Sequence, residues 1–140
     1  MRKINFRGRH LCGQWYYGNL IVRETDSPVL ETPQAYKCVM IGDIEDGSAE
    51  EVEEETIGQF TGLLDKNNKE IYEGDILKVY YCGKSKVFGV VRFYEARFYI
   101  DDEFMRNEHK AKVPMAELFS RYQFEIIGNI HDNPELLKGE

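Results

Sequence analysis

The chain has 140 residues, 42% of them hydrophobic, and a formal net charge of -7. This length supports one core, or one core with a small added subdomain, and excludes two large domains. No apolar run reaches the roughly 18 residues of a membrane helix, and the opening MRKINFR lacks the apolar segment of a signal peptide, so we expect a cytoplasmic protein.

The first 55 residues predict an N-terminal β region. Three runs are rich in β-favouring residues: Lys3–Arg9, Trp15–Arg23 and Tyr36–Ile44. Pro28 and Pro33 mark a loop between the last two runs. The first nine residues contain four basic side chains and no acidic one, a pattern that suits either phosphate contacts or the charged gatekeepers of an edge strand.

The segment Asp43–Glu55 holds eight carboxylates and no basic residue, so it accounts for the net charge. The remaining 17 acidic residues nearly balance the 18 basic ones. Such a block repels itself and lacks aromatic residues, which favours a solvated loop or a frayed linker. Two alternatives stay open: a docking segment for a basic partner, and a mimic of nucleic-acid charge.

Residues 56–140 predict a second region that begins with a hairpin. Asp65–Lys69 has the composition of a tight turn, and Gly74 permits a sharp turn before the next strand. Closely spaced strands are then expected at Asp75–Cys82, Val87–Tyr94 and Arg97–Asp101, which together make a meander suited to a small barrel.

The end of the chain predicts one short helix, one strand and a terminal turn. Pro114 suits a first helical turn, and the apolar residues that follow it up to Tyr122 have helical spacing. Phe124, Ile126 and Ile130 alternate as in a closing strand. Asp132-Asn133-Pro134 predicts a cap before the terminal turn.

Three blocks of this sequence resemble the YopX family of phage and prophage proteins: IGQFTGLLDKNNKEIYEGDIL from Ile57, GVVRF from Gly89 and FEIIGNIHDNPELL from Phe124. The resemblance implies an SH3-like barrel, a bacterial or phage origin and no established activity. It supplies no catalytic residues, because the positions shared with the family look mainly like turn and cap residues, such as Gly62, Asp65 and Gly128.

The fold class expected from all of this is mainly β, or β-dominated α+β. It consists of an N-terminal β extension (residues 1–55), an SH3-like barrel (residues 56–140) and one or two short helices, one of them near residues 114–122.

No group of residues predicts catalysis, a cofactor or a metal. His131 and Asp132 beside Asn129 are better explained as cap residues than as a general base. Carboxylates at Glu70, Glu73 and Asp75 flank a turn, where polar residues are expected in any case. His10 and Cys12 lack further ligands nearby in sequence, and the three widely separated cysteines predict reduced thiols. We therefore expect a protein that is not an enzyme.

Aromatic and basic residues give the better argument for binding. Adjacent tyrosines such as Tyr80 and Tyr81 place one ring on each side of a strand, so some rings are expected outside the core, where they can anchor a partner. The predicted binding surface consists of Tyr80, Lys78, Lys86, Arg92 and Arg97. The first hypothesis is a self-associating protein-interaction module, an oligomeric accessory protein of a phage or prophage. The alternative is a nucleic-acid-binding factor in phage replication or recombination, disfavoured because an acidic chain is repelled by phosphates.

Overall fold

The structure is a computed structural model that describes residues 1–26, 35–43, 45–101 and 113–138. The chain divides into two compact units, Lys3–Gln59 and Phe60–Glu140, the latter joined by Met1–Arg2. The expected loop around Pro28 and Pro33 lies outside the described residues.

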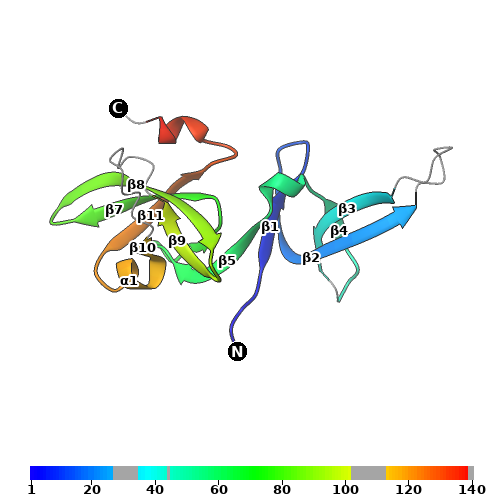
Figure 1. The fold of residues 1–140 in the computed structure, drawn as a ribbon, viewed down its shortest axis with the longest axis horizontal. Helices are drawn as coiled ribbons and strands as arrows, with labels where there is room; N and C mark the ends of the chain where they lie inside the picture. The colour runs from blue at the N-terminus through cyan, green and yellow to red at the C-terminus, as the bar shows by residue number, and fades with distance from the viewer. Residues whose placement is uncertain (27–34, 44, 102–112, 139–140) are drawn as a thin grey trace. The chain divides into compact units, whose positions relative to one another are not determined.

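The N-terminal unit is an antiparallel β structure (Figure 1). Its strands are β1 (Phe6–Arg9), β2 (Trp15–Asp26), β3 (Ala35–Gly42), β4 (Ala49–Glu51) and the first residues of β5 (Gly58–Leu64). Its core is small: Val39, Ile41 and Val52 are buried, and half-buried side chains that include Phe6, Leu20 and Ile57 pack against them. The predicted strands of this region are confirmed, although each differs from the prediction at one end or both.

The acidic segment has more structure than a solvated loop or a frayed linker. It contains β4, which pairs with β3, and a short 3-10 helix, η1 (Glu54–Thr56). The backbone N–H of Val52 donates to the carbonyl of Val39 at 3.0 Å, and its side chain lies in the core. One buried valine among the carboxylates therefore anchors the segment to the unit, which the charge pattern did not indicate.

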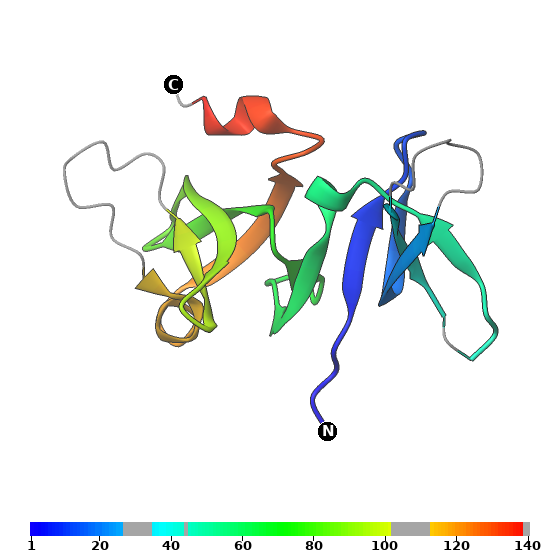
Figure 2. The ribbon, with the colours of Figure 1, turned by 45° about the vertical axis from the view of Figure 1, so that its right-hand side comes forward.

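The C-terminal unit is a five-stranded antiparallel sheet in the order β10-β9-β8-β7-β11. The strands are β7 (Asp75–Tyr81), β8 (Lys84–Tyr94), β9 (Arg97–Asp101), β10 (Val113–Pro114) and β11 (Gln123–Asn129), and the end of β5 pairs separately with β6 (Glu70–Tyr72). The mainly β class is confirmed. Among the described strands, however, β10 and β11 remain the two edges of the sheet, so it does not close into a barrel, although it is visibly curved (Figure 2).

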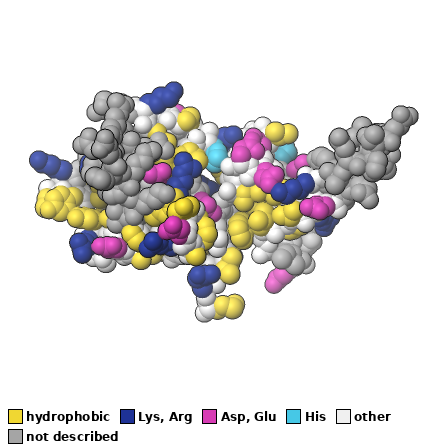
Figure 3. Space-filling model, in the orientation of Figure 1, with side chains coloured by type: hydrophobic (Ala, Val, Ile, Leu, Met, Phe, Trp, Pro, Cys, Tyr) yellow, Lys and Arg dark blue, Asp and Glu magenta, His cyan; other side chains and the backbone are white. Residues whose placement is uncertain are grey.

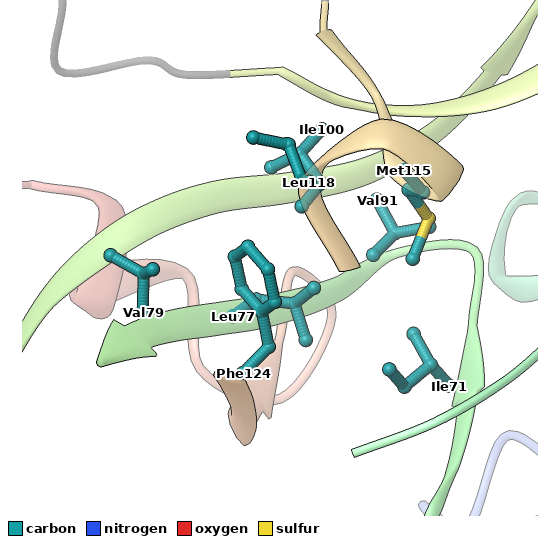
Figure 4. Packing of buried hydrophobic residues seen from close by; sticks show 8 residues of the cluster. All are labelled: Ile71, Leu77, Val79, Val91, Ile100, Met115, Leu118 and Phe124. Carbon is teal, nitrogen blue, oxygen red and sulfur yellow. The ribbon is translucent and has the colours of Figure 1, made fainter. Parts of the chain in front are cut away.

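One face of this sheet carries the larger core. Its buried members come from β6, from four strands of the sheet (β7, β8, β9 and β11) and from the helix α1 (Met115–Phe119): Ile71, Leu77, Val79, Val91, Ile100, Met115, Leu118 and Phe124. Figure 4 shows Leu118 and Met115 of α1 directed toward the side chains of the strands. The predicted helix after Pro114 is present, and Tyr122 packs against the same core.

The turn at Asp65–Lys69 is held by a buried carboxylate. One oxygen of Asp65 accepts the N–H groups of Asn67 and Lys69 at 2.8 and 2.9 Å, and the other accepts that of Ile126 at 3.1 Å. The backbone N–H of Lys66 also donates to the carbonyl of Phe124 at 2.8 Å. The turn is thus tied to the outer edge of β11, a connection between residues about 60 positions apart that sequence spacing does not predict.

A second buried carboxylate fixes the entry into β7. Asp75 accepts the backbone N–H of Tyr72 at 2.8 Å. Gly74 between them has φ +87, a left-handed conformation that glycine adopts without steric cost. The predicted sharp turn before this strand is confirmed.

The C-terminal turn uses a different residue from the one expected. The helical turn η2 (Pro134–Leu137) begins at Pro134 as predicted, but Asn133 makes no side-chain cap; its side-chain oxygen accepts the N–H of Asn129 at 3.4 Å. Asn129 instead binds the N–H groups of His131 and Asp132, at 3.0 and 2.9 Å.

Candidate binding surfaces of the five-stranded sheet

The register of the sheet assigns each predicted binding residue to a face. Residues directly opposite each other on antiparallel strands project from the same face. Lys78 and Tyr80 lie two residues apart on β7 and therefore project from the same face, and Glu125 of β11 lies opposite Lys78. On the neighbouring strands, Arg92 lies opposite Tyr99, and Arg97 lies opposite Tyr94. We call this side, which is opposite the core, the outer face.

Tyr80 on the outer face lies in a polar cluster. Its hydroxyl donates to Glu125 at 2.5 Å, and the ammonium group of Lys66 lies 3.8 Å from the ring centroid. Lys66 also forms an ion pair with Glu125 at 3.6 Å, and Lys78 lies 5.8 Å from the same ring. The Tyr80 hydroxyl lowers the pKa of Glu125, and the same tyrosine, with help from Glu125, raises the pKa of Lys66. This ring already has its partners within the protein and ties the Asp65 turn to the sheet.

Arg92 and Arg97 lie near the opposite end of β8. Arg92 is half-buried and has interactions of its own, and Arg97 forms an ion pair with Glu95 at 3.7 Å. In the hairpin turn between β8 and β9, Glu95 and Ala96 have φ values of 50 and 61, which residues other than glycine rarely adopt. Tyr94 beside it is 51% exposed and meets the ring of Tyr99 edge-on at 6.2 Å.

Lys86 is the predicted residue that the structure separates from the others. It lies opposite Val79, a core residue, and therefore projects from the core face, where its own side chain is exposed. On the same face Lys84 lies directly opposite Tyr81, which is 61% exposed. The ring of Tyr81 meets that of Tyr122 edge-on at 5.4 Å.

Together Tyr81, Tyr122, Lys84 and Lys86 form a surface that we call the tyrosine–lysine patch. At this end of β7, yellow and dark blue side chains lie side by side on the left of Figure 3. The sequence pattern favoured Tyr80 over Tyr81 because Tyr81 alternates with Leu77 and Val79 and so shares the face that was expected to be buried. The available signal was Cys82-Gly83: as a two-residue turn with positive φ at both positions, it places Lys84 opposite Tyr81.

The two units differ in charge. Lys3–Gln59 has 11 acidic and five basic residues, a net charge of -6, whereas the rest of the chain has a net charge of -1. The side chains of Asp43, Glu45 and Asp46 in the turn between β3 and β4 are exposed, and so is that of Glu50 just after it in β4. Hydrogen bonds with Ser48 lower the pKa of Asp46, so this carboxylate is ionised at neutral pH.

The residues considered for catalysis or metal binding take part in local hydrogen bonds. Asn129 donates to Asp132 at 3.1 Å, and His131 has contacts of its own. Glu70 accepts a hydrogen bond from the Tyr72 hydroxyl at 2.8 Å, and Asp75 accepts one from the backbone N–H of Tyr72.

At the β1–β2 turn His10 accepts the backbone N–H of Cys12 at 3.0 Å. Across the part of the chain that the structure describes, no three His, Cys, Asp or Glu side chains are arranged to hold a metal ion.

Fold and surfaces together define a mainly β protein of two compact units with exposed aromatic rings at its hairpin ends. The model of the YopX protein family matches residues 6–138, and the chain belongs to this family. The recognition made from three sequence blocks is thereby confirmed and extended to the N-terminal unit.

A solved structure supports the same fold. The crystal structure of protein EF1440 from Enterococcus faecalis is similar, with a TM-score of 0.54 and 25% sequence identity over 98% of this chain and 99% of that one. No curated protein matches the sequence. None of the described helices has the length and apolar character needed to cross a bilayer.

Proposed function

We propose that this protein is a non-enzymatic accessory protein of a phage or prophage that acts as a self-associating protein-interaction module. The observation that carries the proposal is the exposure of three aromatic rings at the hairpin ends of one sheet. Tyr81, Phe93 and Tyr94 are 61%, 51% and 51% exposed. Each meets a second, less exposed ring edge-on: Tyr122, Phe98 and Tyr99, respectively.

Paired rings of this kind suit protein contacts. Tyrosine and phenylalanine bury much area at little cost in side-chain entropy, and they are enriched at the centres of interfaces. The second ring restrains the first, so less freedom is lost on binding. We regard the five-stranded unit as an opened relative of an SH3-like barrel that presents these rings at its two ends.

The edges of the sheet are poor sites for association. The outer edge of β11 is engaged by the Asp65 turn through Phe124 and Ile126, and Pro114 in β10 lacks a backbone donor. Contacts through side chains at the hairpin ends therefore fit this unit better than the addition of a strand.

The test is the mass of the full chain in solution. Sedimentation equilibrium from low micromolar to several hundred micromolar should give a mass above that of one chain, and the apparent mass should rise with concentration. Alanine at Tyr81 and at Phe93 should weaken association, whereas Tyr17→Ala, at an equally exposed ring in the other unit, serves as the matched control. A single-chain mass at every concentration would refute self-association.

Nucleic-acid binding is the second candidate, favoured by the presence of Lys84 and Lys86 beside the exposed Tyr81. Exposed rings stack on bases and lysines contact phosphates, so binding of a single-stranded oligonucleotide should weaken steeply with salt. The double variant Lys84→Glu and Lys86→Glu should reduce it. An absence of binding at low salt would end this candidate.

A further inference from the structure

We infer that the tyrosine–lysine patch of one molecule binds the acidic β3–β4 turn of a second copy. The inference rests on the proposed self-association and assigns its contact surfaces. It concerns two regions that every molecule carries, one in each unit.

The patch offers two exposed cations next to apolar surface. Lys84 and Lys86 are both exposed and project from the same face as Tyr81. Neither lysine forms a salt bridge with any residue that the structure describes. Their spacing, two residues apart on a strand, places their charges about 7 Å apart along one row. The rings of Tyr81 and Tyr122 adjoin this row, so a partner can bury apolar area and pair charges together.

The β3–β4 turn has the complementary charge. Between Lys37 and Lys66 the sequence contains no lysine or arginine, and the turn lies within that interval. The turn is held in shape by hydrogen bonds: Asp43 N–H to Ser48 carbonyl at 2.7 Å, Gly47 N–H to Asp43 carbonyl at 3.1 Å, and Ser48 N–H to the Asp46 carboxylate at 2.7 Å. These bonds restrain the described residues that flank the exposed carboxylates of Asp43 and Asp46, which reduces the entropy lost on binding.

The charges of the two units fit a contact between copies. The patch lies in the unit of net charge -1, and the unit that would approach it has a net charge of -6, which favours contact with lysines. Because the two surfaces differ, the contact is heterologous: each molecule uses its patch for one neighbour and its turn for another. Such a contact forms rings when the rotation closes and chains when it does not.

The experiment uses two complementary charge-reversed variants of the full chain, compared by sedimentation velocity. The first is Lys84→Glu with Lys86→Glu, and the second is Glu45→Lys with Glu50→Lys; all four residues are exposed. In each variant alone the patch and the turn carry charges of the same sign, so we expect association at least about tenfold weaker than in the wild type. An equimolar mixture should associate again, because the patch of each variant then faces a turn of opposite charge. Lys69→Glu with Lys138→Glu, at two exposed lysines outside the patch, changes the net charge equally and should leave association intact.

The outcomes separate this inference from the proposed function. If the wild type is monomeric at all concentrations, self-association itself is wrong. If the wild type associates and the patch variant does so equally, or the mixture does not recover, self-association stands and the assigned surfaces are wrong. If the patch variant loses binding to a single-stranded oligonucleotide but keeps its mass, the patch is a nucleic-acid surface instead, and the inference is overturned. Far-UV circular dichroism of each variant establishes that it is folded.

Discussion

The two units of this protein hold similar strands together by different means. The C-terminal unit buries eight apolar side chains in one cluster. Among the described residues of the N-terminal unit the cluster has three buried members, with half-buried rings packed against them and close contacts between backbones. Two sheets with the same antiparallel pairing can thus differ greatly in how they tolerate substitution.

The difference in core size indicates which unit is the less stable and which can expose aromatic rings for binding. A small core leaves little reserve, so the N-terminal unit should be the first to open on heating. The larger core allows the C-terminal unit to expose Tyr81, Phe93 and Tyr94 at its ends without losing its fold. The substitutions below test this comparison.

Loss of the central ring of the larger core should have the greatest effect. Phe124 is fully buried and stacks on Phe119 at 4.6 Å between ring centroids. Phe124→Ala should destabilise the C-terminal unit by about 3–5 kcal/mol through lost burial and the cavity that remains. Chemical denaturation followed by tyrosine fluorescence measures the loss, and Phe124→Leu should recover a large part of it. An effect below about 1 kcal/mol would mean that the cluster is not the main source of stability.

Removal of the carboxylate of Asp65 should come next. Asp65→Ala leaves the N–H groups of Asn67, Lys69 and Ile126 without their acceptor, and we expect a cost of about 2–4 kcal/mol. Hydrogen exchange measured by mass spectrometry should show faster exchange at the turn and along β11. Asp65→Asn, which keeps one side-chain oxygen, is the matched control and should cost less. Unchanged exchange at Ile126 would contradict the proposed connection.

Sequence patterns predicted those parts of the fold that depend on local chemistry. Gly74 with Asp75 and the helix after Pro114 follow from residue conformational preferences, and both are present. Three features depended on contacts between distant segments and were not predictable: Val52 in the core, the bond from Asp65 to Ile126, and the open form of the sheet.

The candidate surface was predicted only in part, for a similar reason. Alternation along a single strand cannot tell which face of the sheet becomes the core or where a register shift occurs. A shift between Leu77 and Lys78 adds a residue to β8, so alternation cannot be carried along that strand from Lys86 to Arg92. As a result, Lys86 was grouped with residues of the opposite face.

A methyl group at Gly42 should test the close contacts of the N-terminal unit. A Cβ atom there would lie 2.1 Å from the carbonyl oxygen of Ser48, so the β3–β4 turn would have to move. We expect Gly42→Ala to lower the free energy of unfolding of this unit by about 1–3 kcal/mol. The fluorescence of Trp15, the single tryptophan, measures the unfolding of this unit. Gly47→Ala is the comparison: it has open space but φ +73, and should cost about 1 kcal/mol from backbone strain alone. Equal costs would show that the contact with Ser48 is not tight.

The smallest effect should come from Tyr80→Phe, which removes only a hydroxyl group. In the wild type this hydroxyl lowers the pKa of Glu125 in the folded state, so its contribution to stability is present above the unfolded-state pKa and is lost as pH falls through the folded-state pKa. The pKa of Lys66 is shifted in the other direction: because it is raised, its contribution to stability is present below the unfolded-state pKa and is lost as pH rises through the folded-state pKa.

The difference in melting temperature between wild type and Tyr80→Phe should therefore be greatest near neutral pH and shrink in acid and in strong alkali. NMR titration of the Glu125 carboxyl should show its pKa moving up toward the ordinary value in the variant. A pKa that does not move would mean that the Tyr80 hydroxyl does not bind Glu125 in solution, and the Asp65 turn would then be attached to the sheet by its backbone, by Asp65 and by the contacts of Lys66 and Asn67 with Glu125.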